Sequence, residues 1–416
     1  MTRPSVLLSH SGSNTQAYQI AASLQALGYP AQFVTGFFHK PDGVLARFVR
    51  RLPGPFSASV ERELGRRYDA RLDPARVRLH PLPELLYVAL KRLGLAERRE
   101  ARLILWRDAV FDRHVARLVA RDRPRLVIAH DGQALATIRA ARRAGAIAVL
   151  NQTTGFVLKA LTTYREEAAL HPEFEDSLST HLPLAVGESM RMEALEADRI
   201  FAPSDYVRDS LVEIGVEARR IAMLPYGVDP SRFRPRPAER AGAPFRILFV
   251  GQIGQKKGIK YLLEAVRRLA LPNAELVLAG RIIGSGHGLR PYRDMFRHIP
   301  HVPHGEVHAL YQEADLFVFP SLHEGSAFAN LEAMASGLPV ITTPRAGSLV
   351  RDGEDGYVVP IRDVDALMAR IERLYRDEAL RAAMGASARA RAVAHDWNRH
   401  RDGLDAWLRR FDAEMP

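Results

Sequence analysis

The segment PSLHEGSAFANLEAMASGLPVITT, residues 320–343, carries the strongest pattern in the chain. A strand-like run leads into it, a loop of small residues follows, and a helix is predicted to begin near Phe328. The free N–H groups and positive dipole end of that helix would point back at the loop, where a diphosphate can dock. Glu324 and Glu332, separated by seven residues, would accept hydrogen bonds from sugar hydroxyls and from a ribose diol, respectively. The alternative is that both are surface carboxylates beside an ordinary loop, and their spacing alone does not decide between the two.

A second loop of the same kind, VGQIGQKKG at residues 250–258, lies earlier in the same half of the chain. Gly251 ends a predicted strand, two further glycines keep the loop thin, and Lys256 and Lys257 bring positive charge toward a phosphate. It is not a P-loop, because Gly-x-x-x-x-Gly-Lys-Ser/Thr is absent. Taken alone, the lysines are better explained as an exposed first helical turn. Two phosphate-suited loops on adjacent strands favour a binding function.

Outward from these loops, strand-like runs alternate with helical stretches in both halves of the chain, which is typical of parallel sheets covered on both faces. Residues 225–244 contain five prolines and no strand or helix period, as a linker does. We therefore predict an α/β protein with two Rossmann-like domains facing across a cleft. The predicted domains are residues 1–235 and 245–395, with a linker at 236–244 and a terminal helix at 396–416 that packs back on the first domain. Ligands bind such sheets at the carboxyl ends of their strands.

An ordered series of segments resembles the retaining, metal-independent glycosyltransferases of the GT-B fold, family 4. The series runs through ADRIFAPSDYVRDSLVEIGV (197–216), IAMLPYGVDPSRF (221–233), the two loops above and GSLVRDGEDGYVVP (347–360). It covers nearly the whole second half, whereas the first half matches in layout only. The resemblance implies a transferase of class EC 2.4 that moves a sugar from a nucleotide-diphosphate donor, UDP before GDP, to a glycan or lipid-linked acceptor. It implies polysaccharide or glycoconjugate biosynthesis, retention of anomeric configuration, and no metal or other cofactor.

The resemblance also assigns residues. Glu324, Lys257 and His130 would be catalytic, with His130 contacting the donor sugar and Asp131 orienting it. The family's arginine after the first glycine is replaced here by Gln252, so either Lys256 supplies the missing cation or diphosphate binding is weaker. The expected donor-binding residues are Gly12, Gln252, Lys256, Lys257, His301, Val302, Glu324, Gly325, Ser326, Ala327, Phe328 and Glu332.

Composition narrows the function further. The chain has 416 residues, a net charge of +11 and no cysteine, which excludes disulfides and thiolate metal sites. The sequence shows neither a signal peptide-like start nor a long apolar run. We therefore expect a cytoplasmic protein that is peripheral on the inner face of the membrane. Residues 40–143 hold 24 Lys and Arg against 12 Asp and Glu, so an anionic membrane surface is an expected partner. The run VLARFVRRL (44–52) suits either an interfacial helix or a solvated scaffold helix. Specific nucleic-acid binding is not expected, since no motif for it is present.

Other interpretations of the sequence remain open. Asp363 and Asp365 imitate a metal-binding pair, but capping of the following helix explains them better. The histidines at 298, 301, 304 and 308 lack an accompanying carboxylate pair and are expected to be loop and rim residues. The alternative functions are a non-catalytic relative that binds nucleotide-sugar, and an epimerase or phosphorylase of the same fold.

Overall fold

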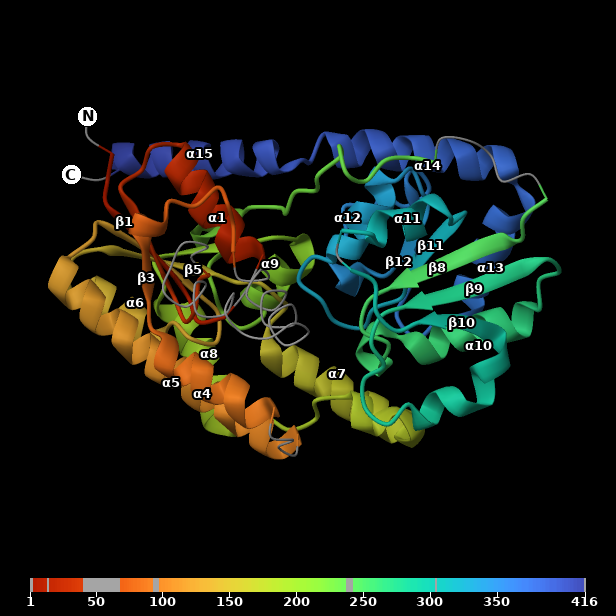
Figure 1. The fold of residues 1–416 in the computed structure, drawn as a ribbon, viewed down its shortest axis with the longest axis horizontal. Helices are drawn as coiled ribbons and strands as arrows, with labels where there is room; N and C mark the ends of the chain where they lie inside the picture. Colours follow the sequence, from red (N-terminus) through yellow and green to blue (C-terminus); the bar gives the residue numbers. More distant parts are fainter. Residues whose placement is uncertain are drawn as a thin grey trace, which may run out of the picture.

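The computed structural model describes residues 3–12, 15–39, 68–92, 97–236, 242–303 and 305–414. The basic run at 44–52, Ser13, His304 and part of the predicted linker lie outside these residues. Two parallel sheets form the framework, one from each half of the chain (Figure 1). This confirms the predicted α/β class with two Rossmann-like sheets.

The first sheet has seven strands in the order β3-β2-β1-β4-β5-β6-β7, all parallel. Its central strands are apolar and almost wholly buried, as expected for a sheet covered on both faces. The strands are β1 (Val6–His10), β2 (Ala31–Thr35), β3 (Val77–Leu79), β4 (Leu126–His130), β5 (Ile147–Asn151), β6 (Arg199–Ala202) and β7 (Ile221–Met223).

The helices that accompany this sheet are α1 (Thr15–Ala26), α4 (Pro81–Arg92), α5 (Glu97–Asp122), α6 (Leu135–Arg143), α7 (Val157–Leu170), α8 (Leu184–Glu196) and α9 (Asp205–Val212). Helix α9 begins as predicted, because the Ser204 hydroxyl caps it by accepting from the Val207 amide. Short 3-10 turns occur at Pro74–Arg76, Pro172–Ser177 and Ala218–Arg220.

The second sheet has six strands in the order β10-β9-β8-β11-β12-β13, again all parallel. These are β8 (Phe245–Val250), β9 (Ala274–Ala279), β10 (Phe296–Ile299), β11 (Leu316–Phe319), β12 (Val340–Thr342) and β13 (Gly356–Val358). Strand β10 includes His298, which was expected in a loop, and ends before Pro300, which has no N–H for a strand ladder.

The helices of the second half are α10 (Ile259–Leu269), α11 (Val307–Gln312), α12 (Phe328–Ala335), α13 (Val364–Arg376), α14 (Glu378–Val393) and α15 (Trp397–Glu414), with 3-10 turns at Gln255–Lys257, His287–Met295 and Pro344–Ala346. Among them, α10 buries Ile259, Leu262 and Leu263, the one-sided spacing predicted for an amphipathic helix.

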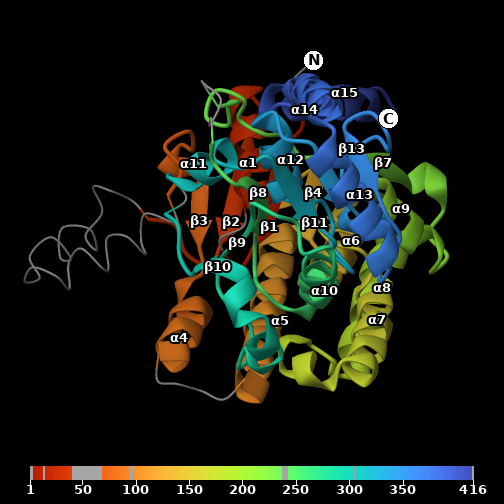
Figure 2. The same ribbon diagram turned by 90° about the vertical axis from the view of Figure 1, so that its right-hand side faces the viewer.

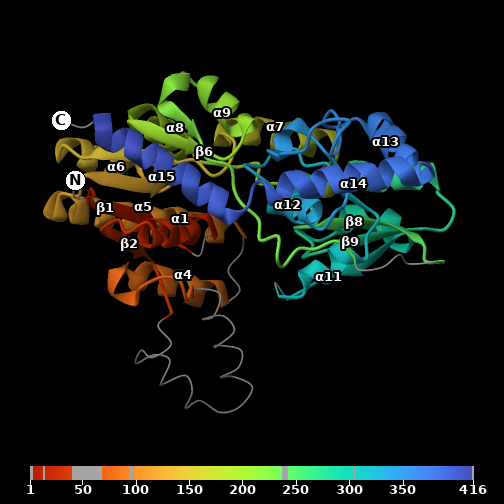
Figure 3. The ribbon, with the colours of Figure 1, turned by 90° about the horizontal axis from the view of Figure 1, so that it is seen from above.

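The last two helices pack against both halves of the molecule. Helices α14 and α15 run almost end to end along one side of the molecule, and α7 and α10 lie on the other side (Figures 1 and 2). Seen from above, α14 covers the second sheet and α15 crosses to the first (Figure 3). Leu404 and Leu408 of α15 are fully buried in the core around α1 and β2, so the C-terminal helix packs against the first sheet.

Strand order fixes where a ligand can bind. In both sheets the order reverses between the first and the fourth strand of the half, β1 and β4 in one and β8 and β11 in the other. Such a reversal leaves a crevice at the carboxyl ends of the two strands. The two loops singled out in the sequence follow β8 and β11, and the predicted site residues Gly12 and His130 lie at the ends of β1 and β4. Among the described residues, no helix is long and apolar enough to cross a bilayer.

Candidate functional site

A cavity of about 350 Å³, here called the cleft cavity, lies between the two sheets at these strand ends. Both loops predicted from the sequence line it. The first half of the chain adds Gln16 at the start of α1 and the loop after β5. The lining consists of Gln16, Thr153, Thr154, Val250, Gly251, Gln252, Lys257, Phe319, Glu324, Gly325, Ser326, Ala327, Phe328 and Ala329.

Glu324 and Lys257 form an ion pair inside the cleft cavity. Their side chains are only 15% and 12% exposed, so water screens the pair little. Burial, together with the neighbouring charge of Lys256, holds the pKa of Lys257 well below its usual range. The structure thus brings a carboxylate from the end of β11 against a cation from the end of β8, as the two sequence patterns require.

Glycine residues, which have no side chain, allow the two loops to approach each other this closely. Gly258 adopts a left-handed conformation with φ +68°, and a Cβ there would lie 2.1 Å from the Pro320 carbonyl oxygen. A Cβ on Gly325 would lie 1.7 Å from the carbonyl oxygen of Thr153 in the first domain. Only glycine therefore lets the two loops, and the two domains, approach this closely.

The start of α12 offers fewer donors than the sequence indicates. The Ala327 amide already donates to the Ala346 carbonyl at 3.2 Å. No side chain caps the helix at Ala327. Ser326, Phe328 and Ala329 line the cleft cavity beside that position. Their amides have no acceptor among the described residues, so they remain for an anion.

Glu332 lies one turn into α12 and accepts a 2.8 Å hydrogen bond from the Tyr311 hydroxyl. Burial raises its pKa to about 7, while the Tyr311 bond and the charge of Arg232 oppose the rise. Glu332 is not among the residues that line the cleft cavity. Of the two predicted nucleobase contacts, His301 is exposed and Val302 packs against the second-domain core.

His130, at the carboxyl end of β4, is 1% exposed. Its Nδ1 lies 2.9 Å from the Ser9 carbonyl oxygen and therefore carries the proton. Burial and the adjacent His10 ring, 4.8 Å away edge-on, lower its pKa and keep it neutral. The buried Nε2 has no partner among the described residues, which leaves it a free acceptor for a hydroxyl.

The expected role of Asp131 is wrong. It accepts hydrogen bonds from the Thr153 hydroxyl at 2.8 Å and from the Gln152 side chain at 3.1 Å, whereas the Ser9 carbonyl orients His130. Burial raises the pKa of Asp131 to about 6. Asp131 thus holds the loop after β5 against the cleft. Gly12 is close by, and its amide donates to His10 Nδ1 at 3.0 Å.

The two lysines of the second loop diverge. An adjoining cavity of about 310 Å³, here called the side cavity, is lined by both lysines, whereas only Lys257 also lines the cleft cavity. Gln252 is exposed and borders both cavities. The side cavity is lined by Thr154, Val157, Ala160, Tyr164, Ser177, Ser179, Met190, Gln252, Gly254, Lys256, Lys257, Ile283 and His323.

Sequence analysis missed the contributions of Gln16, Thr153 and Thr154. The signal for the threonines was available, because the small polar loop Thr153-Thr154-Gly155 directly follows a predicted strand. No comparable signal marks Gln16, a polar residue on an ordinary helix.

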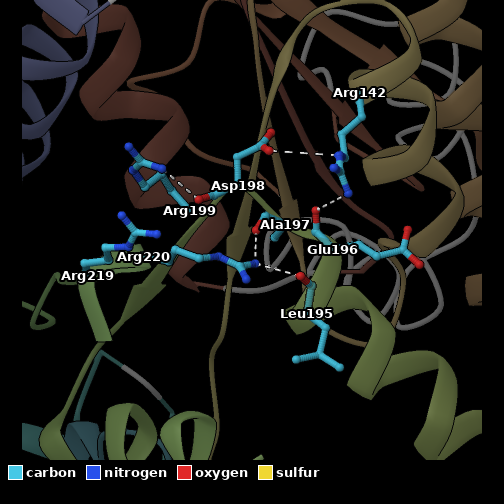
Figure 4. Close-up of a pocket in the computed structure, with 8 residues that line it drawn as sticks. All are labelled: Arg142, Leu195, Glu196, Ala197, Asp198, Arg199, Arg219 and Arg220. Atoms are coloured by element: carbon cyan, nitrogen blue, oxygen red, sulfur yellow. Dashed lines mark hydrogen bonds and ion pairs between the residues drawn. The ribbon is translucent and has the colours of Figure 1, made fainter. Parts of the chain in front are cut away.

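Another cavity, of about 480 Å³, lies at the opposite, amino-terminal ends of the first-sheet strands (Figure 4). Its arginines serve the fold. Arg220 donates to the carbonyl oxygens of Ala194, Leu195 and Ala197 at the end of α8, and Arg142 donates to that of Glu196. These bonds satisfy the free carbonyls of a helix C-terminus, so this cavity is not a functional site.

The acidic pair at 363 and 365 is also engaged in the fold. Asp363 caps α13 by accepting from the Ala366 amide at 2.8 Å, and Asp365 pairs with Arg268 at 2.6 Å. His298 lies 2.9 Å from the Gly280 carbonyl oxygen through Nε2.

Comparison with known proteins identifies the family of this chain. The glycosyl transferase 4-like domain matches residues 11–227, and the glycosyl transferases group 1 domain matches residues 232–391. The chain belongs to the glycosyl transferase 4-like family. The Glu324 and Lys257 loops both fall in the group 1 part of this family member, and Gly12, His130 and Thr153 fall in the 4-like part.

Among curated relatives, the D-inositol 3-phosphate glycosyltransferase of Geodermatophilus obscurus is 35% identical over 240 residues, 51% of this chain and 52% of the relative. The MMP alpha-(1->4)-mannosyltransferase of Mycolicibacterium hassiacum is 28% identical over 85% of this chain and 90% of the relative. The chain spans about half the length of the first curated relatives it matches. Among solved structures, Anabaena HepE in complex with UDP-glucose superposes with a TM-score of 0.63 at 14% identity, covering 98% and 100% of the two chains. This similarity establishes the GT-B fold of the family member.

Proposed function

We propose that this chain transfers a sugar from a UDP-sugar to a glycan or lipid-linked acceptor, with retention of anomeric configuration. The observation that carries the proposal is the Glu324–Lys257 pair, held in one cavity where the strand ends of both sheets meet. A relative that contains UDP-glucose in the same fold supports the choice of donor. A relative named D-inositol 3-phosphate glycosyltransferase supports an acceptor that is itself a polar saccharide or polyol.

In this proposal, negative charge builds on the diphosphate as its bond to the sugar breaks. Lys257 and the amides of Ser326 and Phe328 would stabilise that charge, since they are fixed in place before the reaction. These groups would neutralise the diphosphate charge that a metal ion could otherwise neutralise, so we propose metal-independent transfer. Glu324 would hold the donor sugar, and the free Nε2 of His130 would accept from one of its hydroxyls. The acceptor hydroxyl attacks the same face that the diphosphate leaves, and its proton passes to a departing phosphate oxygen.

A thermal-shift series followed by a transfer assay tests the proposal. UDP and UDP-hexoses are expected to raise the unfolding temperature, because a ligand that binds only the folded state stabilises it. A product of the same anomeric configuration as the donor, formed in the presence of EDTA, would support retention and metal independence. Conversion of the nucleotide-sugar without any acceptor would instead indicate an epimerase. Binding without turnover would indicate a non-catalytic relative.

The raised pKa of Glu332 predicts pH-dependent nucleotide binding. With a pKa of about 7, Glu332 is mostly protonated at pH 6 and mostly ionised at pH 8. Only the ionised form offers both oxygens to a ribose diol, so UDP affinity is expected to rise about tenfold across this window. The measurement is calorimetric titration of UDP at several pH values.

Two variants separate Glu332 from the titration of the nucleotide itself. In Glu332→Gln, UDP affinity is expected to rise less between pH 6 and pH 8, because only the titration of the nucleotide remains. Tyr311→Phe removes the bond that opposes the raised pKa, so the midpoint is expected to move to higher pH. A wild-type profile identical to that of Glu332→Gln would show that Glu332 does not bind the ribose.

We further propose that the first domain docks on an anionic membrane surface. Helix α4 exposes Leu82, Leu85 and Leu86 at helical spacing, and the neighbouring α5 exposes Trp106. The surrounding chain is basic, and apolar side chains among basic residues suit an anionic interface.

Leu82→Gln is expected to weaken binding to vesicles of phosphatidylcholine and phosphatidylglycerol by about fivefold, the loss of roughly 1 kcal/mol of apolar burial. Leu184→Gln is the matched control, because Leu82 and Leu184 are 75% and 76% exposed and lie on different helices. Equal co-sedimentation of wild type and Leu82→Gln would contradict the placement of the membrane face on α4.

A further inference from the structure

The side cavity carries positive charge that no acidic side chain among its described lining residues neutralises. Lys256 and Lys257 both line it, and none of its described lining residues is acidic. Lys257 already contacts Glu324 on the cleft side. No hydrogen bond or ion pair joins the Lys256 ammonium to any residue that the structure describes. The cavity therefore carries one free positive charge.

The Lys256 side chain is held in this position by its backbone. Its carbonyl oxygen accepts from the Leu322 amide at 3.0 Å and from the Ser321 hydroxyl at 3.3 Å. These bonds fix the lysine to the strand end that carries Glu324. Burial lowers the pKa of the Lys256 ammonium, so placing an unpaired cation here costs folding free energy.

The histidine that lines the side cavity with Lys256 does not offset this charge. His323 Nδ1 lies 2.7 Å from the Tyr206 hydroxyl, and Nε2 lies 3.1 Å from the Gly155 carbonyl oxygen. Burial and the charges of Lys256, Arg345 and Lys257 lower the pKa of His323 to about 3, so the ring is neutral. An anion entering the cavity would relieve the field that these cations create.

The side cavity continues the cleft cavity, since Thr154, Gln252 and Lys257 line both. Their volumes of about 350 and 310 Å³ each lie within the range typical of ligand sites, about 300–1,000 Å³. Val157, Tyr164 and Met190 give the side cavity an apolar wall, which suits the face of a sugar ring.

We propose that the side cavity binds a carboxylate carried by a sugar of the substrate, and that Lys256 is its counter-ion and a determinant of substrate specificity. One free cation matches a monoanion, and a hexuronate is a sugar that carries one. The inference rests on the proposed function, because it places this sugar beside the donor. The carboxylate belongs either to the donor sugar or to the acceptor sugar, and both would reach the same lysine.

The test compares wild type, Lys256→Gln and Lys260→Gln by calorimetric titration. The matched control Lys260 lies on the same segment and pairs with Glu173 at 3.2 Å outside the cavity. The donor arm uses UDP, UDP-glucose and UDP-glucuronate. The acceptor arm uses methyl glucoside and methyl glucuronide with saturating UDP.

In one arm, wild type is expected to bind the uronate about tenfold or more tightly than its neutral counterpart, the worth of one hydrogen-bonded charge pair. Lys256→Gln is expected to abolish that preference and to lose less affinity for UDP than for the uronate, whereas Lys260→Gln keeps the preference. The arm in which the preference occurs identifies whether donor or acceptor carries the carboxylate.

Three outcomes would overturn the inference. Equal binding of uronate and neutral sugar in both arms would show that the side cavity does not recognise a carboxylate. A loss of UDP affinity in Lys256→Gln as large as the loss for the uronate would make Lys256 a diphosphate ligand instead. Retention of the preference in Lys256→Gln would place the counter-ion elsewhere. Absence of UDP binding by wild type is a separate result, which would reject the UDP-sugar proposal and with it the inference.

The ligand-free proteins give an independent readout. Lys256→Met removes a half-buried charge that has no partner among the described residues, so its unfolding temperature is expected to rise by a few degrees. A fall in that temperature would show that Lys256 is paired in the folded protein, and would contradict the free charge on which the inference depends.

Discussion

Lys257→Ala is expected to reduce the rate of sugar transfer by about 10²–10³-fold, with the main loss in kcat. That is the typical cost of removing one preorganised donor from a site where charge develops. Lys257 is 12% exposed and lies against Glu324, so water cannot readily replace it. The measurement is steady-state transfer with a labelled UDP-sugar.

Lys260→Ala is the control for this prediction. Its ammonium pairs with Glu173 at 3.2 Å, near the surface, where such a pair contributes about 1 kcal/mol or less. Its transfer rate is expected to stay within about twofold of wild type. A wild-type transfer rate in Lys257→Ala would show that Lys257 does not contribute to the reaction.

Glu324→Ala is expected to lose transfer to a similar extent, because the carboxylate that holds the donor sugar is gone. The double variant is expected to lose far less than the product of the two single losses, since the residues contact each other and act as one unit. Multiplicative losses would show that the two side chains act independently, and would contradict their joint role in the cleft cavity.

Local patterns explain why much of the fold was predictable. Strand–loop–helix units, the cap at Ser204 and the cap at Asp363 each involve residues a few positions apart. The parallel sheets follow from the alternation of strands and helices, and the site follows from the loops at the strand ends. Glu324 and Lys257 were placed together for this reason, although 67 positions separate them.

Contacts between distant segments explain what was not predictable. Asp131 and Thr153 are 22 positions apart, and nothing in either segment signals that this pair forms. Tyr311 meets Glu332 from a different helix and sets its ionisation. Lys256 and Lys257 are adjacent in sequence, but the turn at Gln255–Lys257 places Lys257 on both cavities and Lys256 on the side cavity alone. The direction of a side chain in such a turn depends on packing that the sequence does not encode locally.

Gly325→Ala is expected to reduce transfer by about 100-fold or more, although it removes no functional group. The added Cβ would lie 1.7 Å from the Thr153 carbonyl oxygen and 2.9 Å from the Thr154 Cα, and backbone atoms cannot move aside as a flexible side chain can. The loop cannot retreat on its other side. The Gly325 carbonyl accepts from the Ser204 hydroxyl, and a Cβ on Gly347 would lie 1.9 Å from that same oxygen.

The clash must therefore shift Glu324, whose amide donates to the Arg345 carbonyl at 2.9 Å and whose carbonyl accepts from the Gly155 amide at 3.3 Å. A displacement of about 1 Å at a reacting centre can cost 10²-fold in rate. Gly305→Ala is the matched control, since a Cβ there meets nothing within 4 Å, and its rate is expected to equal that of wild type. A Gly325→Ala enzyme that transfers sugar within threefold of wild type would show that the two domains react at a wider separation, with Thr153 away from the Glu324 loop.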